Sequence, residues 1–155
     1  MQKAKIFLSL GSNLGDRQKN IQTAIEYLKE NVEIEKVSTI IETKPYGYTQ
    51  QPHFLNCCLM GKTSLLPFEL LDFVLGIEKK MGRERIFKWG PRNIDIDILF
   101  YDSLVIDDKK LKIPHPELQK RDFVLIPLNE IAPDFVHPVL KKTVSQLYRE
   151  LVNTK

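Results

Sequence analysis

The segment NIDIDILFY carries two aspartates at alternate positions, Asp95 and Asp97. Because side chains alternate between the two faces of a β-strand, both carboxylates are expected on one face, opposite the three isoleucines. Their Cα atoms would lie roughly 6.5 to 7 Å apart. Two Mg²⁺ ions roughly 3.5 to 4 Å apart would remove the repulsion between the carboxylates and bind the oxygens of a phosphoryl transfer. The alternative is a solvated strand face that carries two acids without a function.

The residues just before this strand favour the metal-site interpretation. KWGPRN is typical of a turn and would bring Trp89 and Arg92 to the start of the strand. Arg83 and Arg85 precede the turn in a segment without a clear period, which predicts a loop whose guanidinium groups close over a triphosphate. An exposed basic loop without a role is the alternative. Groups for metal, phosphate and ring stacking therefore converge as a nucleotide site requires.

Two further segments carry candidate binding groups. In FLNCCLM, Phe54 and Asn56 share one strand face, and an aromatic ring beside an amide suits a flat heterocycle. Core packing is nevertheless the commoner role of a phenylalanine. PHPELQKRDFVLIPL places His115 after a proline and Arg121 near Phe123, although a lone histidine is usually structural.

The glycine-containing loop GSNLGD does not provide a phosphate-binding motif. It lacks the Gly-Lys-Ser/Thr ending of a Walker A sequence, which occurs nowhere in the chain. A phosphate at the N-terminus of the following helix is conceivable. Asp16 at the capping position favours a structural turn instead. Side chains and metal would therefore have to bind the phosphates.

The elements that position these groups follow the order strand, helix, strand, strand, helix, strand. This order predicts an α+β, ferredoxin-like βαββαβ sheet with both helices on one face, which leaves the other face available for a site. A small hairpin around Asp107 and Asp108 follows, and Thr143 with Gln146 predicts a capping box that opens a last helix. The expected elements are strands over residues 5–10, 34–43, 54–62 and 94–101, and helices over 17–28 and 67–81.

Composition restricts the class of protein further. The 155 residues, 43% of them hydrophobic, fit one domain, taken as residues 1–155. No segment approaches the ~20 apolar residues that a membrane span requires, so a cytoplasmic protein without a membrane partner is expected. A net charge of +3 is too small to argue for nucleic-acid binding, whereas the local arginine cluster indicates a small molecule that bears phosphates.

The cysteines and histidines argue against disulfide and zinc chemistry. Cys57 and Cys58 are adjacent in a strand-like segment, so their side chains point to opposite faces and are expected to be reduced core thiols. With three scattered histidines and no CxxC pair, no ligand set for structural zinc is available. A bound metal would therefore be held by carboxylates.

Taken together, five segments resemble the hydroxymethyldihydropterin pyrophosphokinases in order and spacing. The resemblance covers nearly the whole chain, and WGPRNIDIDIL is its most specific part. It implies a ferredoxin-like fold, ATP as co-substrate, two Mg²⁺ ions, and transfer of pyrophosphate from ATP to the hydroxymethyl group of a reduced pterin with release of AMP. The segments are GSNLGD, TKPYG, FLN, WGPRNIDIDIL and PHPELQKRDFVLIPLNEIAPDFVHP.

The resemblance also implies roles for individual residues. Asp95 and Asp97 would bind both metal ions. As a mechanism, and apart from the resemblance, we expect Asp97 to be a candidate proton acceptor. The triphosphate contacts would be Arg83, Arg92, His115 and Arg121. Because positioning and electrostatics should dominate this chemistry, we expect Arg83 and Arg92 to contribute to catalysis. The pterin contacts would be Phe54 and Phe123 on its two faces, and Asn56, Thr43, Tyr46 and Gly47 along its edge; Trp89 would close the site.

Two other classes of protein remain as alternatives. A palm-like nucleotidyltransferase also carries paired aspartates on a ferredoxin-like sheet, but it would release pyrophosphate rather than AMP. A non-enzymatic RNA-binding sheet could use Phe54 and Phe123 as stacking platforms. Asp95 and Asp97 on that face would repel a nucleic-acid backbone, so no nucleic-acid partner is expected. The chain is expected to act as a monomer on small-molecule substrates.

Overall fold

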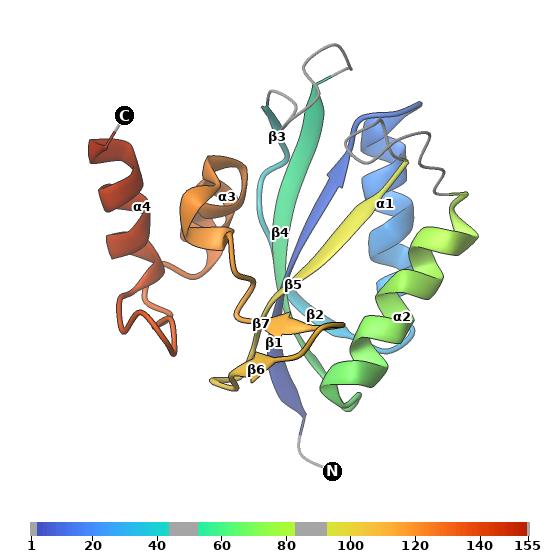
Figure 1. Cartoon of the computed structure of the whole chain (residues 1–155). Coiled ribbons are helices and arrows are strands. Elements are labelled where there is room, and N and C mark those ends of the chain that lie inside the picture. Colours follow the sequence, from blue (N-terminus) through green and yellow to red (C-terminus); the bar gives the residue numbers. More distant parts are fainter. Residues whose placement is uncertain (1–2, 44–52, 83–92, 155) are drawn as a thin grey trace.

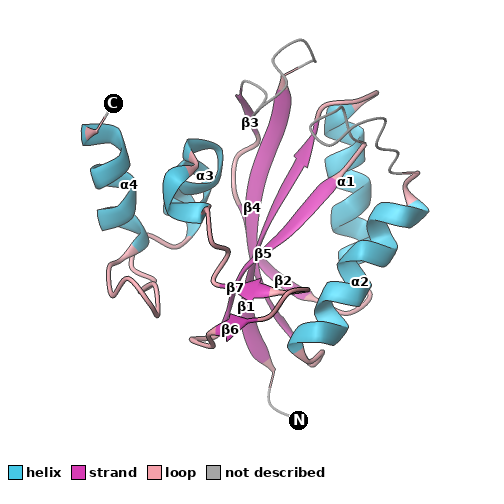
Figure 2. Ribbon diagram, viewed as in Figure 1, coloured by secondary structure: helices cyan, strands magenta, loops and turns pink. Residues whose placement is uncertain are grey.

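The computed structural model of the chain describes residues 3–43, 53–82 and 93–154 (Figure 1). The first part of the chain forms strands with two helices among them, and the C-terminal part is mostly helical (Figure 2). The strands are β1 (Ala4–Ser12), β2 (Glu33–Val37), β3 (Ile41–Thr43), β4 (Phe54–Thr63), β5 (Asp95–Tyr101), β6 (Ile106–Asp107) and β7 (Lys112–Ile113). The helices are α1 (Arg17–Leu28), α2 (Pro67–Lys80), the 3₁₀ helix η1 (Leu118–Lys120), α3 (Asp122–Ile131) and α4 (Val144–Asn153).

The main sheet is antiparallel in every pairing and has the strand order β2–β4–β1–β5. β3 pairs with the first residues of β4, so β2 and β3 lie one after the other along the same edge of β4. The helices α1 and α2 lie together on one face of the sheet (Figure 1). The predicted ferredoxin-like order, with both helices on one face, is confirmed.

The single strand expected over residues 34–43 is wrong, because the chain leaves the sheet between β2 and β3. At this break the Ser38 backbone N–H donates to the Cys58 carbonyl (2.9 Å), and the Ser38 hydroxyl accepts from the Cys58 N–H (2.9 Å). The Thr39 N–H and hydroxyl then donate to the Glu130 carboxylate of α3 at 3.1 Å. Side-chain hydrogen bonds thus replace part of the strand ladder, an option that Ser and Thr offer the backbone.

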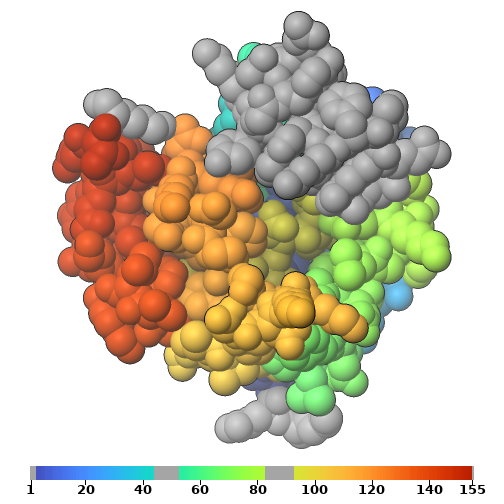
Figure 3. Space-filling view, in the orientation of Figure 1, coloured from blue at the N-terminus to red at the C-terminus, as the bar shows by residue number. Residues whose placement is uncertain are grey.

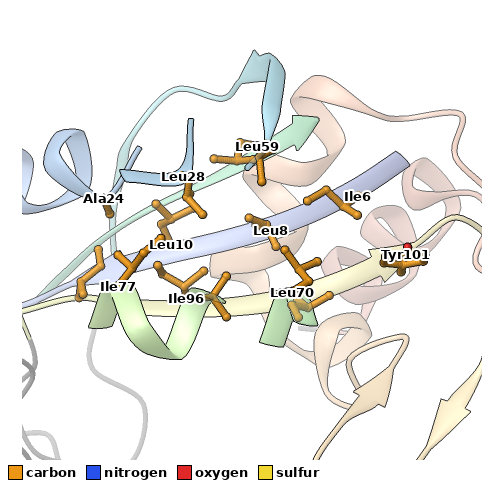
Figure 4. Packing of buried hydrophobic residues seen from close by; sticks show 14 of the residues in the cluster. Ile6, Leu8, Leu10, Ala24, Leu28, Leu59, Leu70, Ile77, Ile96 and Tyr101 are labelled. Atoms are coloured by element: carbon orange, nitrogen blue, oxygen red, sulfur yellow. The ribbon is translucent and has the colours of Figure 1, made fainter. Parts of the chain in front are cut away.

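The face under α1 and α2 holds the larger hydrophobic core. Ile6, Leu8 and Leu10 of β1 are at most 1% exposed and project toward both helices, as the alternation in the sequence predicts. Figure 4 shows these side chains between Ala24 and Leu28 of α1 and the leucine and isoleucine side chains of α2. Ile94, Ile96 and Ile98 join the same core. Asp95 and Asp97, which alternate with them along the chain, must therefore face the other side of the sheet.

The opposite face is covered only in part, by α3 and α4. Phe7, Cys58 and Phe100 project from it and pack with Leu125 and Leu128 of α3 in a second buried cluster. This cluster occupies one end of the face. The polar residues of β1, β4 and β5 lie at the other end, which the second cluster does not include.

Helix α3 was not among the elements expected from the sequence. The segment contains Pro127, which lacks the N–H that a helix interior needs. Its residues are also almost all hydrophobic, so the sequence shows no helical period there. Pro127 is itself buried in the helix. The helix forms because Val124, Leu125 and Leu128 bury against the sheet, and tertiary packing outweighs the local penalty.

The expected capping box of α4 is confirmed. The Thr143 N–H donates to Gln146 Oε1 (2.8 Å), and the Gln146 N–H donates to Thr143 Oγ1 (3.1 Å).

Cys57 and Cys58 are free and buried, and they belong to different hydrophobic clusters on the two faces of the sheet. Burial raises the pKa of the Cys57 thiol to about 12, so this thiol stays protonated and unreactive. In the part of the chain that the structure describes, none of the helices has the length and hydrophobicity to cross a bilayer.

Candidate active site

Cross-strand register gathers the polar residues at the uncovered end of the sheet. Gly11 of β1 is paired with Asn56 of β4 on one side and with Asp95 of β5 on the other. Two residues earlier in β1, Ser9 is paired with Asp97. Because residues opposite each other in antiparallel strands project to the same face, these five side-chain positions form one continuous surface.

Arg121 connects α3 to Asp97. It immediately precedes α3, and its Nη1 lies 3.9 Å from Asp97 Oδ2. The Arg121 side chain is 16% exposed and that of Asp97 is 35% exposed, so this ion pair is better shielded from water than a surface pair. The Phe123 ring centroid lies 5.5 Å from Arg121 Cζ. The structure thereby brings Arg121, named from the sequence, next to Asp97, and places Phe123 beside Arg121.

The aspartate pair suits a hard divalent cation. Carboxylates offer only acceptor oxygens, and Mg²⁺ is usually bound through one or two of them together with substrate phosphates and water. Within residues 3–43, 53–82 and 93–154, no group of three or more His, Cys, Asp and Glu side chains could hold a metal without other ligands. Asp95 and Asp97 therefore fit Mg²⁺ that arrives with a phosphorylated substrate, and they do not fit a structural zinc site.

His115 lies near the aspartates as a neutral donor. Its backbone N–H donates to the Leu99 carbonyl of β5 (3.1 Å), and its Nδ1 accepts from the Glu117 N–H (3.2 Å). The proton of the neutral ring is therefore on Nε2. Burial, and then the nearby Arg121 cation, lower the pKa of His115 to about 4, so it is uncharged at neutral pH.

A cleft adjoins the aspartates between α2, β5 and the β6–β7 hairpin. It measures about 260 Å³, and Asp95, Asp97 and His115 line one part of it. Figure 3 shows a hollow over β5, with the atoms of α3 (orange) on one side and those of α2 (light green) on the other. Its other lining residues were not identified from the sequence, because they come from three separate elements without a shared motif. They include Leu71, Leu75, Ile98 and Leu111, which are apolar, and Lys110 and Lys112, which are basic.

Glu78 of α2 is a further residue that the sequence did not single out. It is only 3% exposed and lines the cleft. Its Oε2 accepts a hydrogen bond of 2.7 Å from the N–H of Ile96, the residue between the two aspartates. β5 is the edge strand of the sheet, so this N–H points away from β1 and Glu78 provides its acceptor. A carboxylate at a helical core position is the signal that could have identified it.

The groups proposed for a flat ring lie on the β4 side of the surface. Asn56 is 6% exposed, and its Nδ2 donates to Thr43 Oγ1 of β3 at 2.6 Å. Phe54 is paired with Thr43 across β3 and β4, and its ring approaches the backbone of Gly11. An aromatic ring and an oriented amide therefore stand side by side over β1, on the same face as Asp95.

Tyr46, Gly47, Arg83, Trp89 and Arg92 lie outside the described residues, so their roles remain predictions. The described residues at the ends of both segments are held together. Arg17 Nη1 donates to Glu42 Oε2 (2.9 Å) and to the His53 carbonyl (2.8 Å), on either side of residues 44–52. Asn93 Nδ2 donates to the carbonyls of Met81 (2.9 Å) and Gly82 (3.0 Å), on either side of residues 83–92. The described residues that flank each of these two segments are therefore joined to one another at the ends of the strands that carry the candidate site.

The GSNLGD loop is held by hydrogen bonds within its own region. Asp16 Oδ1 accepts from the Lys19 N–H (3.1 Å) and caps α1. Asn20 Nδ2 donates to the Leu14 carbonyl (2.8 Å) and to Ser12 Oγ (3.2 Å). These contacts favour the structural turn over a phosphate site at the start of α1.

We expect Glu78→Ala to lower the free energy of unfolding by about 1 to 3 kcal/mol, because the Ile96 N–H loses its acceptor in a buried position. Glu78→Gln keeps an acceptor oxygen and should lose clearly less. Chemical denaturation of both variants measures the difference. Equal stability of wild type and Glu78→Ala would contradict the assigned contact.

We expect His115 to stay neutral below pH 6, because its pKa is about 4 in the folded protein. The unfolded chain would bind the proton near pH 6.5, so folding stability should fall as the pH is lowered from about 6.5 toward 4. NMR titration of the ring nitrogens measures the pKa directly. His115→Gln should lose less stability than wild type over this range, by an amount on the order of 2 kcal/mol after allowance for partial exposure. Parallel stability curves, or a measured pKa near 6.5, would refute this.

Comparison with known proteins relates the chain to one family. Residues 7–133 match the model of the 7,8-dihydro-6-hydroxymethylpterin-pyrophosphokinase (HPPK) family. The 2-amino-4-hydroxy-6-hydroxymethyldihydropteridine pyrophosphokinase of Aquifex aeolicus is 52% identical over 147 residues, which are 95% of this chain and 92% of the relative. The enzyme of the same name from Bacillus subtilis is 46% identical over 127 residues, 81% of this chain and 76% of the relative.

A solved structure supports the fold. The wild-type HPPK-DHPS chain of Plasmodium falciparum with pteroate superposes with a TM-score of 0.80 at 19% sequence identity, over 98% of this chain. The present chain spans 45% of that longer chain, so the likeness concerns the fold of this part alone. The match over residues 7–133 and the 52% identity to a relative that is covered to 92% establish that the chain belongs to the 7,8-dihydro-6-hydroxymethylpterin-pyrophosphokinase family.

Proposed function

We propose that this protein transfers pyrophosphate from ATP to the hydroxymethyl group of 6-hydroxymethyl-7,8-dihydropterin and releases AMP, a step of folate biosynthesis. The observation that carries the proposal is the surface on which Asn56, Gly11 and Asp95 stand in one cross-strand row in a chain of this family. A ring-binding amide at one end of the row and a metal-binding carboxylate at the other suit a reaction between a heterocyclic alcohol and a metal-bound polyphosphate.

The pterin binds on the β4 side of this surface. The Phe54 ring stacks on one face of the heterocycle and Phe123 on the other. Asn56, oriented by its bond to Thr43, forms hydrogen bonds with the edge of the ring. Backbone groups of Tyr46 and Gly47 complete this recognition.

ATP binds on the β5 side. The apolar walls of the cleft, Leu71, Ile98 and Leu111, accept the nucleoside, and Lys110 at the same cleft neutralises part of the phosphate charge. Neutral His115 donates its Nε2–H to a phosphate oxygen, and Arg121 contributes a charged donor beside Asp97. In addition, the segment 83–92 supplies Arg83 and Arg92 to the triphosphate and Trp89 to close the site.

Asp95 and Asp97 would hold two Mg²⁺ ions together with the phosphates. When bound, the ions neutralise the triphosphate and lower the pKa of the pterin hydroxyl. The hydroxyl oxygen forms a bond to the β-phosphorus while the bond from that phosphorus to the α,β-bridging oxygen breaks, so AMP leaves with the electron pair. Asp97 accepts the hydroxyl proton, and Arg121 lies beside it as a charged donor for the phosphates.

We also propose a monomeric, cytoplasmic protein that forms one domain over residues 1–155. Two free, buried cysteines suit a reducing compartment. The two hydrophobic clusters lie on opposite faces of the same sheet, which suits a single folding unit.

Product analysis tests this function directly. The protein is mixed with MgATP and 6-hydroxymethyl-7,8-dihydropterin, and AMP is separated from ADP and pyrophosphate. We expect AMP that depends on the pterin and is lost in EDTA. Absence of AMP from a folded preparation that binds ATP would reject the function, and release of pyrophosphate would indicate nucleotidyl transfer instead.

The aspartate variants sharpen this assay. Asp95→Asn and Asp97→Asn should each reduce AMP formation by about 10²-fold or more, because each loses a metal ligand and Asp97→Asn also loses the proton acceptor. Asp134→Asn removes an exposed carboxylate after α3 and serves as the matched control with normal activity. Near-normal turnover of Asp97→Asn would remove that residue from the mechanism.

A further inference from the structure

The backbone conformation at Gly11 is one that any residue could adopt, so it does not explain why a glycine occupies this position. It lies inside β1, and among the described residues only Gly15 and Gly82 are glycines with positive φ. A glycine in a strand interior weakens the strand and has no side chain to pack, so its presence needs another reason. One such reason is the close approach of other groups to the backbone.

The space above Gly11 is occupied by the two ring-binding side chains. A Cβ atom built on Gly11 would lie 2.8 Å from Asn56 Oδ1 and 3.3 Å from a ring carbon of Phe54. The first distance is shorter than real Cβ contacts allow, and the second is tighter than most. Any side chain at this position would therefore displace the Asn56 amide and press on the Phe54 ring.

Other glycines of the chain provide the comparison. A Cβ on Gly61, also in a strand, would lie 2.7 Å from the backbone oxygen of Glu33 and 2.7 Å from Val32, so that glycine allows β2 and β4 to pack. A Cβ on Gly76 in α2 would meet no atom within 4 Å. Gly11 differs from both because the groups that need its space are side chains of the candidate site.

We propose that Gly11 determines the position of the pterin, because its missing side chain lets the Asn56 amide and the Phe54 ring lie over β1. This inference rests on the proposed function. Asn56 Nδ2 is directed to Thr43 Oγ1, so Oδ1, the atom that a Cβ would strike, is the acceptor directed over Gly11. Gly11 is thus a positioning residue that acts on the substrate through Asn56 and Phe54.

The effect should fall on one substrate. Moving the Asn56 amide would break its 2.6 Å bond to Thr43 and misplace the acceptor. Loss of one such oriented hydrogen bond is expected to weaken pterin binding about tenfold. The nearest atoms to the added Cβ belong to Asn56 and Phe54 and not to Asp95, so MgATP binding should change less than about twofold.

The test measures binding of pterin and of MgATP, and KM for each, in wild type, Gly11→Ala and Gly11→Val. We expect pterin affinity to fall in the order Gly, Ala, Val while MgATP affinity stays nearly constant. Gly76→Ala should match wild type, and Gly61→Ala should lower stability without separating the two substrates. Equal losses for both substrates in folded Gly11→Ala, or unchanged pterin affinity, would overturn the proposal.

A double-mutant cycle keeps the test decisive if Gly11→Ala folds poorly. Asn56→Ala removes the atom that the new Cβ would strike. Adding Gly11→Ala to this variant should therefore cost less than about twofold further in pterin affinity and little stability. A full additional loss in the double variant would overturn the proposal. Failure of wild-type protein to form pterin-dependent AMP would instead reject the proposed function itself.

Discussion

The two-residue period of β1, β4 and β5 determines which side chains can reach the site. Ile6, Leu8 and Leu10 bury under α1 and α2, and this fixes Ser9 and Gly11 on the opposite face. A shift of one residue in the pairing would place the aspartates of β5 in the hydrophobic core, where two ionised carboxylates would cost several kcal/mol each. Burial of the isoleucines therefore also positions the carboxylates.

The sheet face opposite α1 and α2 holds a hydrophobic cluster at one end of the strands and the candidate site at the other end. At one end Phe7 and Phe100 pack under α3 and α4, and at the other end β1 and β5 carry Gly11 and Asp95. The start of α3 lies at the boundary, because Val124 packs over Cys58 while Arg121 reaches Asp97. Docking of α3 thus both stabilises the sheet and brings a cation and an aromatic ring to the site.

The sequence predicted those features of the fold that depend on side-chain alternation in a strand or on residues that begin a helix. Alternation in NIDIDILFY placed Asp95 and Asp97 on one face, and the Thr143 and Gln146 pair opened α4 as expected. The break between β2 and β3 and the presence of α3 could not be predicted, because both depend on tertiary contacts such as that of Glu130 with Thr39. The same holds for the cleft, whose lysines and leucines come from different elements. Glu78 could have been suspected as a carboxylate at a core position, but its partner Ile96 is visible only in the fold.

The central claim is that the pterin binds on the uncovered half of the second sheet face and that MgATP binds next to it, between the aspartates and the cleft at the β5 edge. Amide chemical-shift mapping with the pterin and a non-hydrolysable MgATP analogue tests it most directly. The account predicts that the largest changes cluster at residues 9–13, 54–58, 71–78, 95–98 and 110–123, with the pterin affecting the β4 side and the nucleotide the β5 side and the adjoining cleft. Changes confined to the outer surfaces of α1 and α4, or to the lysine-lined depression around Lys3 and Lys62 at the start of β1, would contradict it.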